Sequence, residues 1–339
     1  MPHLSELAVR IPIGLLPVLS FLAALLYLDS YKLTALRTVL CLIVIGGLIA
    51  GASYLANRLA LDALAVPFVA YSRYVAPILE ELLKGLAIVY LIRANRIGFL
   101  VDAAIAGFAI GAGFALIENL YYLQHRPEAQ IGVWIVRGFG TAIMHGGATA
   151  LFALMAQAFT ERGLDLRLKS FLPGLAVAIM LHSLFNHFFF SPILSTLGVL
   201  LVLPPLMVLV FRKSAEAVAS WLQVGFDADT ELLELIDSGR LAQSRVGEYL
   251  DDIKHRFRGP VIADLLCYLR LHTELALRAK GMLMMREIGF QPGDDAEVRE
   301  KFRELRFLEG SIGTTGRLAL QPFLHVSRKD LWQLKLLQR

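Results

Sequence analysis

Seven apolar stretches, each long enough to cross a lipid bilayer as a helix, follow one another along the first 211 residues of the chain. A spanning helix needs about 20 predominantly apolar residues. Because the backbone cannot leave its polar groups unpaired in hydrocarbon, runs of this length predict a bundle of membrane helices. The stretches cover residues 11–28, 39–56, 74–92, 98–123, 131–159, 171–190 and 192–211.

A further apolar segment, residues 59–72, contains Asp62 and Pro67 and is followed by Arg73. This segment fits an interfacial helix, a re-entrant piece or an eighth, short span. The predicted number of membrane helices is therefore seven or eight.

Charge divides the 339-residue chain into two parts. Residues 1–213 contain 25 charged side chains, whereas the remaining 126 residues contain 37. Apolar residues of the second part follow helical spacing, without sustained strand-type alternation. The sequence thus predicts an all-α protein. A polytopic helical membrane bundle over residues 1–213 is followed by a soluble, mostly helical C-terminal domain over residues 214–339.

The basic residues indicate orientation and partners. Nine Lys and Arg side chains fall on the loop side that carries the tail, and four fall on the other side. By the positive-inside rule, seven spans place the N-terminus outside and the tail in the cytoplasm, whereas eight spans place the N-terminus inside. Neither part has the basic excess that nucleic-acid binding needs. The expected partners are the lipid bilayer, a substrate and an unidentified cytoplasmic partner of the tail.

Ionisable side chains nevertheless lie within the predicted spans. A charge at the bilayer centre costs about 2.5–3.5 kcal/mol on insertion scales, so such groups must be paired and mark functional sites. The ionisable residues, with two amides, are Glu80, Glu81, Lys84, Asp102, Glu118, Asn119, Arg137, His145, His182, Asn186 and His187.

The predicted depth of these groups brings several of them together. At 1.5 Å per residue, Glu80 and Glu118 lie about 8–10 Å below the outer ends of their helices. On another helix His182 lies about 12 Å deep and Asn186 about 6 Å deep. His145 is expected nearer the middle of the bilayer. Four helices thus place polar groups mainly in the outer half of the membrane.

Local spacing adds detail to this cluster. Glu80 and Lys84 are four residues apart and are expected to form an ion pair, which leaves Glu81 on an adjacent face. His182 and Asn186 are also four residues apart, so both side chains are expected to project into one cavity.

Peptide hydrolysis by activated water is the chemistry that this set of groups suits. It needs a base for the water, hydrogen-bond donors for the oxyanion and an acid for the leaving amine. Arg137 is expected to neutralise a carboxylate such as Glu118. No serine with a neighbouring base stands out, and Cys41 lacks an evident partner, which disfavours covalent catalysis.

A metal ion is an open alternative for activating the water. Glu118, His145 and His182 would supply two imidazoles and one carboxylate, with a fourth position left for water, as in catalytic zinc sites. The chain has no HExxH motif. Metal-assisted and metal-free mechanisms both fit these residues.

Four short motifs contain these residues. They read Glu80-Glu81-x-x-Lys84, Phe114-x-x-x-Glu118-Asn119, a Gly- and Ala-rich helix with Arg137 and His145, and His182-x-x-x-Asn186. In this order they resemble the motifs of the PrsW family of intramembrane proteases, which is related to CAAX prenyl endopeptidases and bacteriocin-processing enzymes. The resemblance covers residues 74–190, about a third of the chain.

The resemblance implies a protease of the bacterial inner membrane, classed as metallopeptidase-like, that cuts a membrane-anchored protein such as an anti-sigma factor. It implies that Glu80 or Glu81 activates water with Glu118, that His145 assists or binds metal, and that His182 with Asn186 holds the oxyanion. Lys84, Asn119 and Arg137 would support these groups. The long tail departs from a minimal family member.

Two functions of other classes remain as alternatives. A transporter or proton relay also uses buried Glu and His residues, but it should show an inverted repeat, which this sequence lacks. A receptor or scaffold that acts through the tail would explain residues 214–339, but not the polar cluster.

Overall fold

The computed structural model describes residues 4–126, 128–161, 168–257, 259–290, 296–324 and 328–337, and every regular element within these ranges is helical. This confirms the predicted all-α fold. The chain separates into two units. Unit 1 contains Met1–Asp29 and Leu33–Ala215, and unit 2 contains Ser30–Lys32 and Glu216–Arg339.

Unit 1 is a helical bundle with two π-helical turns. The turn Tyr71–Val75 joins α3 to α4, and the turn Val136–Thr141 joins α6 to α7. The helices of unit 1 are α1 (Leu4–Leu28), α2 (Leu36–Leu64), α3 (Phe68–Ala70), α4 (Ala76–Arg93), α5 (Leu100–His125), α6 (Ile131–Ile135), α7 (Ala142–Glu161), α8 (Leu172–His187) and the first part of α9 (Pro192–Asp237).

All seven predicted stretches are helical, although not all are ideal spans. The segment 59–72 does not form a helix of its own. Helix α2 continues to Leu64, residues 65–67 are not helical, and the rest belongs to α3 and the first π-helical turn. Helix α8 is apolar but shorter, with 16 residues. Within the described residues, five helices are long and apolar enough to cross a membrane: Ala8–Leu28, Leu36–Leu64, Leu100–His125, Ile131–Glu161 and Pro192–Asp237.

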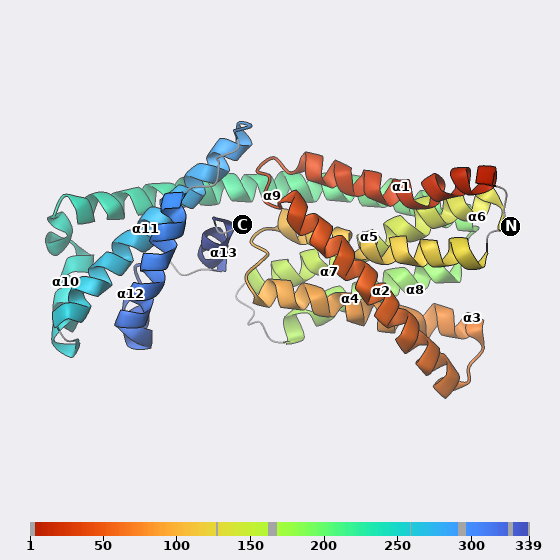
Figure 1. Cartoon of the computed structure of the whole chain (residues 1–339), viewed down its shortest axis with the longest axis horizontal. Helices are drawn as coiled ribbons and strands as arrows, with labels where there is room; N and C mark the ends of the chain where they lie inside the picture. Colours follow the sequence, from red (N-terminus) through yellow and green to blue (C-terminus); the bar gives the residue numbers. More distant parts are fainter. Residues whose placement is uncertain are drawn as a thin grey trace. The chain divides into compact units, whose positions relative to one another are not determined.

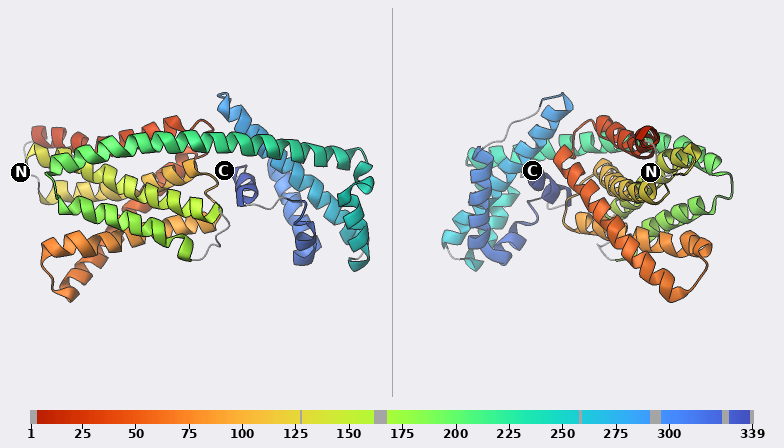
Figure 2. Two further views of the ribbon diagram at one scale, coloured as in Figure 1. Left: turned by 180° about the vertical axis from the view of Figure 1, so that it is seen from behind. Right: turned by 45° about the vertical axis from the view of Figure 1, so that its right-hand side comes forward.

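Helix α5 lies at the centre of unit 1. Its side chains from Val101 to Ala115 are all buried. Figure 1 shows α4, α5, α7 and α8 side by side, with α2 crossing over them. In the view from behind (Figure 2), the first part of α9 runs along α7 and α8, and residues of these three helices line an apolar cavity. The central helix is therefore placed to carry buried polar groups.

Glycines allow the helices around α5 to approach closely. A Cβ atom on Gly46 of α2 would lie 2.0 Å from the carbonyl oxygen of Ile110 in α5. A Cβ atom on Gly111 of α5 would lie 2.3 Å from the carbonyl oxygen of His145 in α7. Small residues permit such backbone contact between membrane helices. The close approach places His145 directly against α5.

Unit 2 has a separate hydrophobic core. Leu265, Leu269 and Leu275 of α11 pack with Phe302 and Leu308 of α12. The elements of unit 2 are the last part of α9, α10 (Arg245–Ile253), α11 (Gly259–Glu287), α12 (Ala296–Leu320) and α13 (Arg328–Leu336). A soluble, helical tail was predicted, and the described part of this unit is helical.

The contact at Gly46 predicts a loss of stability on substitution. Gly46→Ala should destabilise the bundle by about 1–3 kcal/mol, because the added methyl group overlaps a backbone carbonyl. Gly51→Ala is the matched control on α2, since a Cβ atom there meets nothing within 4 Å. It should be neutral or stabilising, because Ala favours the helix over Gly. Thermal unfolding of the two variants in detergent measures the difference, and equal melting temperatures would contradict the packing argument.

Candidate active site

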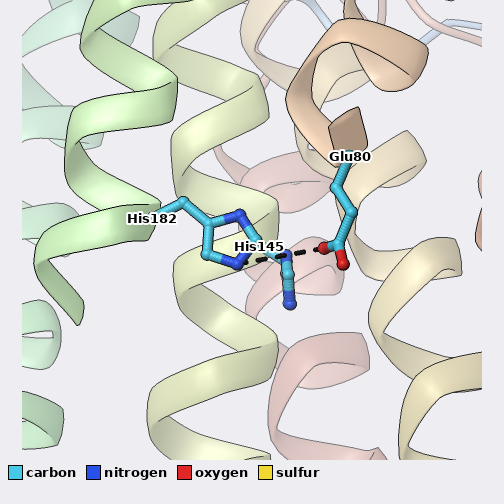
Figure 3. Close-up of side chains that lie close together, drawn as sticks. All are labelled: Glu80, His145 and His182. Atoms are coloured by element: carbon cyan, nitrogen blue, oxygen red, sulfur yellow. Dashed lines mark ion pairs between the residues drawn. The ribbon is translucent and has the colours of Figure 1, made fainter. Parts of the chain in front are cut away.

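Side chains from four helices meet in unit 1, as the sequence predicted. Glu80 comes from α4, His145 from α7 and His182 from α8, and each offers one ligand atom within 4.8 Å of the others. Figure 3 shows the three side chains pointing toward one another. The two imidazole rings lie edge to face with centroids 4.6 Å apart. Glu118 of α5 joins the cluster through His145.

Lys84 is fully buried and pairs with Glu81. Its Nζ atom lies 2.6 Å from Glu81 Oε1, and the Nδ1 atom of His182 lies 2.9 Å from the same oxygen. The expected pair between Glu80 and Lys84 was therefore wrong. Residues three apart are also neighbours on a helix, and the Lys84 ammonium lies 4.2 Å from the ring centroid of Phe114 in α5. Lys84 thus binds the more buried of the two glutamates.

His145 links Lys84 to Glu118. Its Nδ1 atom lies 3.0 Å from Lys84 Nζ, and its Nε2 atom lies 3.1 Å from Glu118 Oε2. An ammonium group can only donate hydrogen bonds. The network therefore assigns the proton of a neutral His145 to Nε2, where it is donated to Glu118.

Arg137 neutralises Glu118, as predicted. The Arg137 Nη2 atom lies 3.2 Å from Glu118 Oε1. Asn119 supports this arrangement, because its Oδ1 atom accepts a hydrogen bond from Arg137 Nε at 2.9 Å, and its Nδ2 atom donates to the carbonyl oxygen of Gly14 at 2.7 Å. Arg137 also lies 3.5 Å from the ring centroid of Tyr122. The guanidinium thus contacts a carboxylate, an amide oxygen and an aromatic ring.

Two residues that the sequence analysis did not select support the cluster, Asn57 directly and Tyr71 through Asn57. Asn57 of α2 donates from Nδ2 to Glu80 Oε1 at 3.0 Å, and the Tyr71 hydroxyl donates to Asn57 Oδ1 at 2.9 Å. Asn57 lies just after an apolar stretch, where a polar residue is ordinary. Its partner lies 23 positions later, so no local spacing could identify it.

Asn186 is engaged elsewhere. Its Nδ2 atom donates to the carbonyl oxygen of Ser72 at 2.9 Å. His182 points into the cluster, whereas the amide of Asn186, one turn further along α8, holds the first π-helical turn. The structure thus separates the two residues that were expected to share one cavity.

The donor groups fit a metal ion. Since Glu81 accepts the Nδ1 proton of His182, the Nε2 lone pair of His182 faces Glu80 Oε2 across 3.9 Å. Two acceptors that face each other need either a metal ion or a proton between them. A carboxylate on the other ring nitrogen is typical of histidines that bind metals. Binding by His145 would replace its contact with Lys84 or Glu118.

The metal-ligand group differs from the predicted set. Among the described residues, the group whose ligand atoms lie within 4.8 Å of one another contains Glu80 with His145 and His182. Glu118 had been expected in the place of Glu80. Instead it is bound by Arg137 and His145 and stands beside this group.

Comparison with known proteins identifies the family. Residues 34–211, just over half of the chain, match the model of the PrsW family intramembrane metalloproteases. No curated protein and no solved structure matches the chain. The matched range contains the cluster and the four motifs, and the resemblance found in the sequence is confirmed. The chain therefore belongs to the PrsW family and is an intramembrane protease.

Proposed function

We propose that the protein is an endopeptidase that cleaves a membrane-anchored protein in the outer half of the bacterial inner membrane, with its tail in the cytoplasm. The observation that carries the proposal is the convergence of Glu80, His145 and His182 within 4.8 Å, with Glu118 bonded to His145. Peptide hydrolysis needs a base beside groups that stabilise developing negative charge. The cluster contains both.

Glu118 is the proposed general base. Its side chain is 29% exposed, whereas that of Glu81 is 1% exposed and bound to Lys84. Glu118 would accept a proton from water as the water oxygen attacks the substrate carbonyl carbon. The same proton would pass to the leaving nitrogen as the C–N bond breaks. The Arg137 cation beside Glu118 favours negative charge on the carbonyl oxygen.

Glu80, His145 and His182 are the proposed ligands of a divalent ion, for which zinc suits the donors. When bound, such an ion polarises the substrate carbonyl and lowers the pKa of water. The remaining polar residues position these three. Glu81 orients His182 through its Nδ1 atom, and the Lys84 ammonium holds the Glu81 carboxylate in place.

Replacing the base tests the activity directly. Glu118→Gln should slow cleavage of a single-span reporter by about 100-fold or more, because an amide cannot accept the proton. Asp62→Asn, an acid-to-amide change at an exposed position on α2, should keep the rate of the unmodified protein. The measurement is product formation by purified protein in liposomes. Undiminished cleavage by Glu118→Gln would show that another group is the base.

Metal analysis tests the ligand set. The purified protein should hold about one divalent ion per chain, and a chelator should abolish cleavage until zinc is restored. Glu80→Gln and His182→Ala should reduce the metal content measured by atomic emission. His125→Ala, an exposed histidine of α5, is the control and should hold the metal. Activity that survives chelation would instead favour a proton between Glu80 and His182.

Breaking the buried ion pair should cost stability. Lys84→Met leaves the Glu81 carboxylate buried without its cation, which should destabilise the fold by about 3–5 kcal/mol. Adding Glu81→Gln removes the unpaired charge and should restore much of that loss. Thermal unfolding in detergent checks both variants. If Lys84→Met alone is as stable as the unmodified protein, the pair does not stabilise the bundle.

A further inference from the structure

The first π-helical turn, Tyr71–Val75, contacts both sides of the site. On one side, the Tyr71 hydroxyl donates to Asn57 Oδ1. This bond fixes which end of the Asn57 amide faces Glu80, because the oxygen is taken and the NH2 group must point the other way. Tyr71 is 3% exposed, so its side chain is packed inside the bundle.

Glu80 is held differently from its two acidic neighbours. Glu81 is bound by the Lys84 ammonium and Glu118 by the Arg137 guanidinium, whereas Glu80 receives its hydrogen bond from the neutral amide of Asn57. The amide takes Oε1 and leaves Oε2 facing His182 Nε2. A neutral donor fixes the orientation of the carboxylate without cancelling its charge.

On the other side, the same turn binds α8. The carbonyl oxygen of Ser72 accepts a hydrogen bond from Asn186 Nδ2 at 2.9 Å, and that of Arg73 accepts one from Ser183 Oγ at 2.6 Å. A π-helical turn departs from regular helical pairing and is common at functional sites. The two side chains follow His182 on α8, at the next position and one turn later, and fix the position of that helix along its axis relative to the turn.

We propose that this π-helical turn is the positioning element of the active site. Through Tyr71 and Asn57 it orients the carboxylate of Glu80, and through Asn186 and Ser183 it holds the helix of His182. Asn186 is then a positioning residue and not an oxyanion donor. The inference rests on the proposed function, since it concerns how Glu80 Oε2 and His182 Nε2 are placed opposite each other.

A double-mutant cycle tests the link to Glu80. Tyr71→Phe and Asn57→Leu should each lower kcat by about 10- to 100-fold, with KM within about twofold, because a small misplacement of a reacting group is costly. The double variant should be no slower than the slower single variant, since the two residues act in series. Tyr74→Phe is the matched control. It removes an exposed hydroxyl from the same turn but keeps the ring that contacts His187.

Metal content and melting temperature complete that test. Tyr71→Phe and Asn57→Leu should both bind metal more weakly than Tyr74→Phe. Their melting temperatures should lie within a few degrees of that of Tyr74→Phe. The link to Glu80 would be wrong if Tyr71→Phe and Asn57→Leu kept wild-type kcat and metal affinity. It would also be wrong if the reduction of kcat in the double variant equalled the product of the two single reductions. If Glu118→Gln abolishes cleavage while Tyr71→Phe and Asn57→Leu behave like the wild type, only the positioning role is wrong and the proposed function stands.

Amide hydrogen exchange tests the link to α8. Asn186→Ala and Ser183→Ala should both raise the exchange rates of residues 71–76 and lower kcat, because each removes a hydrogen bond to the turn. An oxyanion donor behaves differently. If Asn186→Ala lowers kcat with exchange unchanged, and Ser183→Ala has wild-type activity and exchange, Asn186 acts on the substrate and this part of the proposal is wrong.

Discussion

The buried ion pair between Lys84 and Glu81 is the interaction on which the site depends. An ammonium group with no exposed surface is stable in an apolar bundle only if a carboxylate and other polar atoms compensate it. Here Glu81 lies at 2.6 Å and His145 Nδ1 at 3.0 Å. Because His145 and His182 are bound to the two members of this pair, its position sets the orientation of both rings. The ion pair therefore connects α4 to α7 and α8.

Close helix packing lets these bonds form. Backbone contact between α5 and its neighbours at Gly46 and Gly111 leaves no room for side chains between the helices. The polar groups of α5 and α7 are then near enough for direct hydrogen bonds, such as that between His145 and Glu118. Both π-helical turns supply carbonyl oxygens that accept hydrogen bonds from side chains of other helices. Packing and polar contacts thus specify one arrangement.

The sequence predicted the bundle and most of the clustered groups, because charges are rare in apolar helices and stand out there. It predicted that Arg137 neutralises Glu118, but it did not predict which glutamate pairs with Lys84. Glu80 and Glu81 are adjacent in sequence, and the choice of Lys84 between them depends on the ring of Phe114 and on Asn57 from another helix. Asn186 shares a helical face with His182, yet its amide donates a hydrogen bond to the carbonyl oxygen of Ser72 in the π-helical turn. Such turns leave no clear mark in a sequence.

Charge balance favours a further cation in the cluster. Glu80, Glu81 and Glu118 bring three negative charges when ionised, whereas Lys84 and Arg137 bring two positive charges. With both imidazoles neutral, the cluster keeps one negative charge in surroundings where an unpaired charge is costly. That charge falls on Glu80, whose hydrogen-bond donor is a neutral amide. A metal ion, or a proton between Glu80 Oε2 and His182 Nε2, would restore the balance at the place where these two atoms face each other.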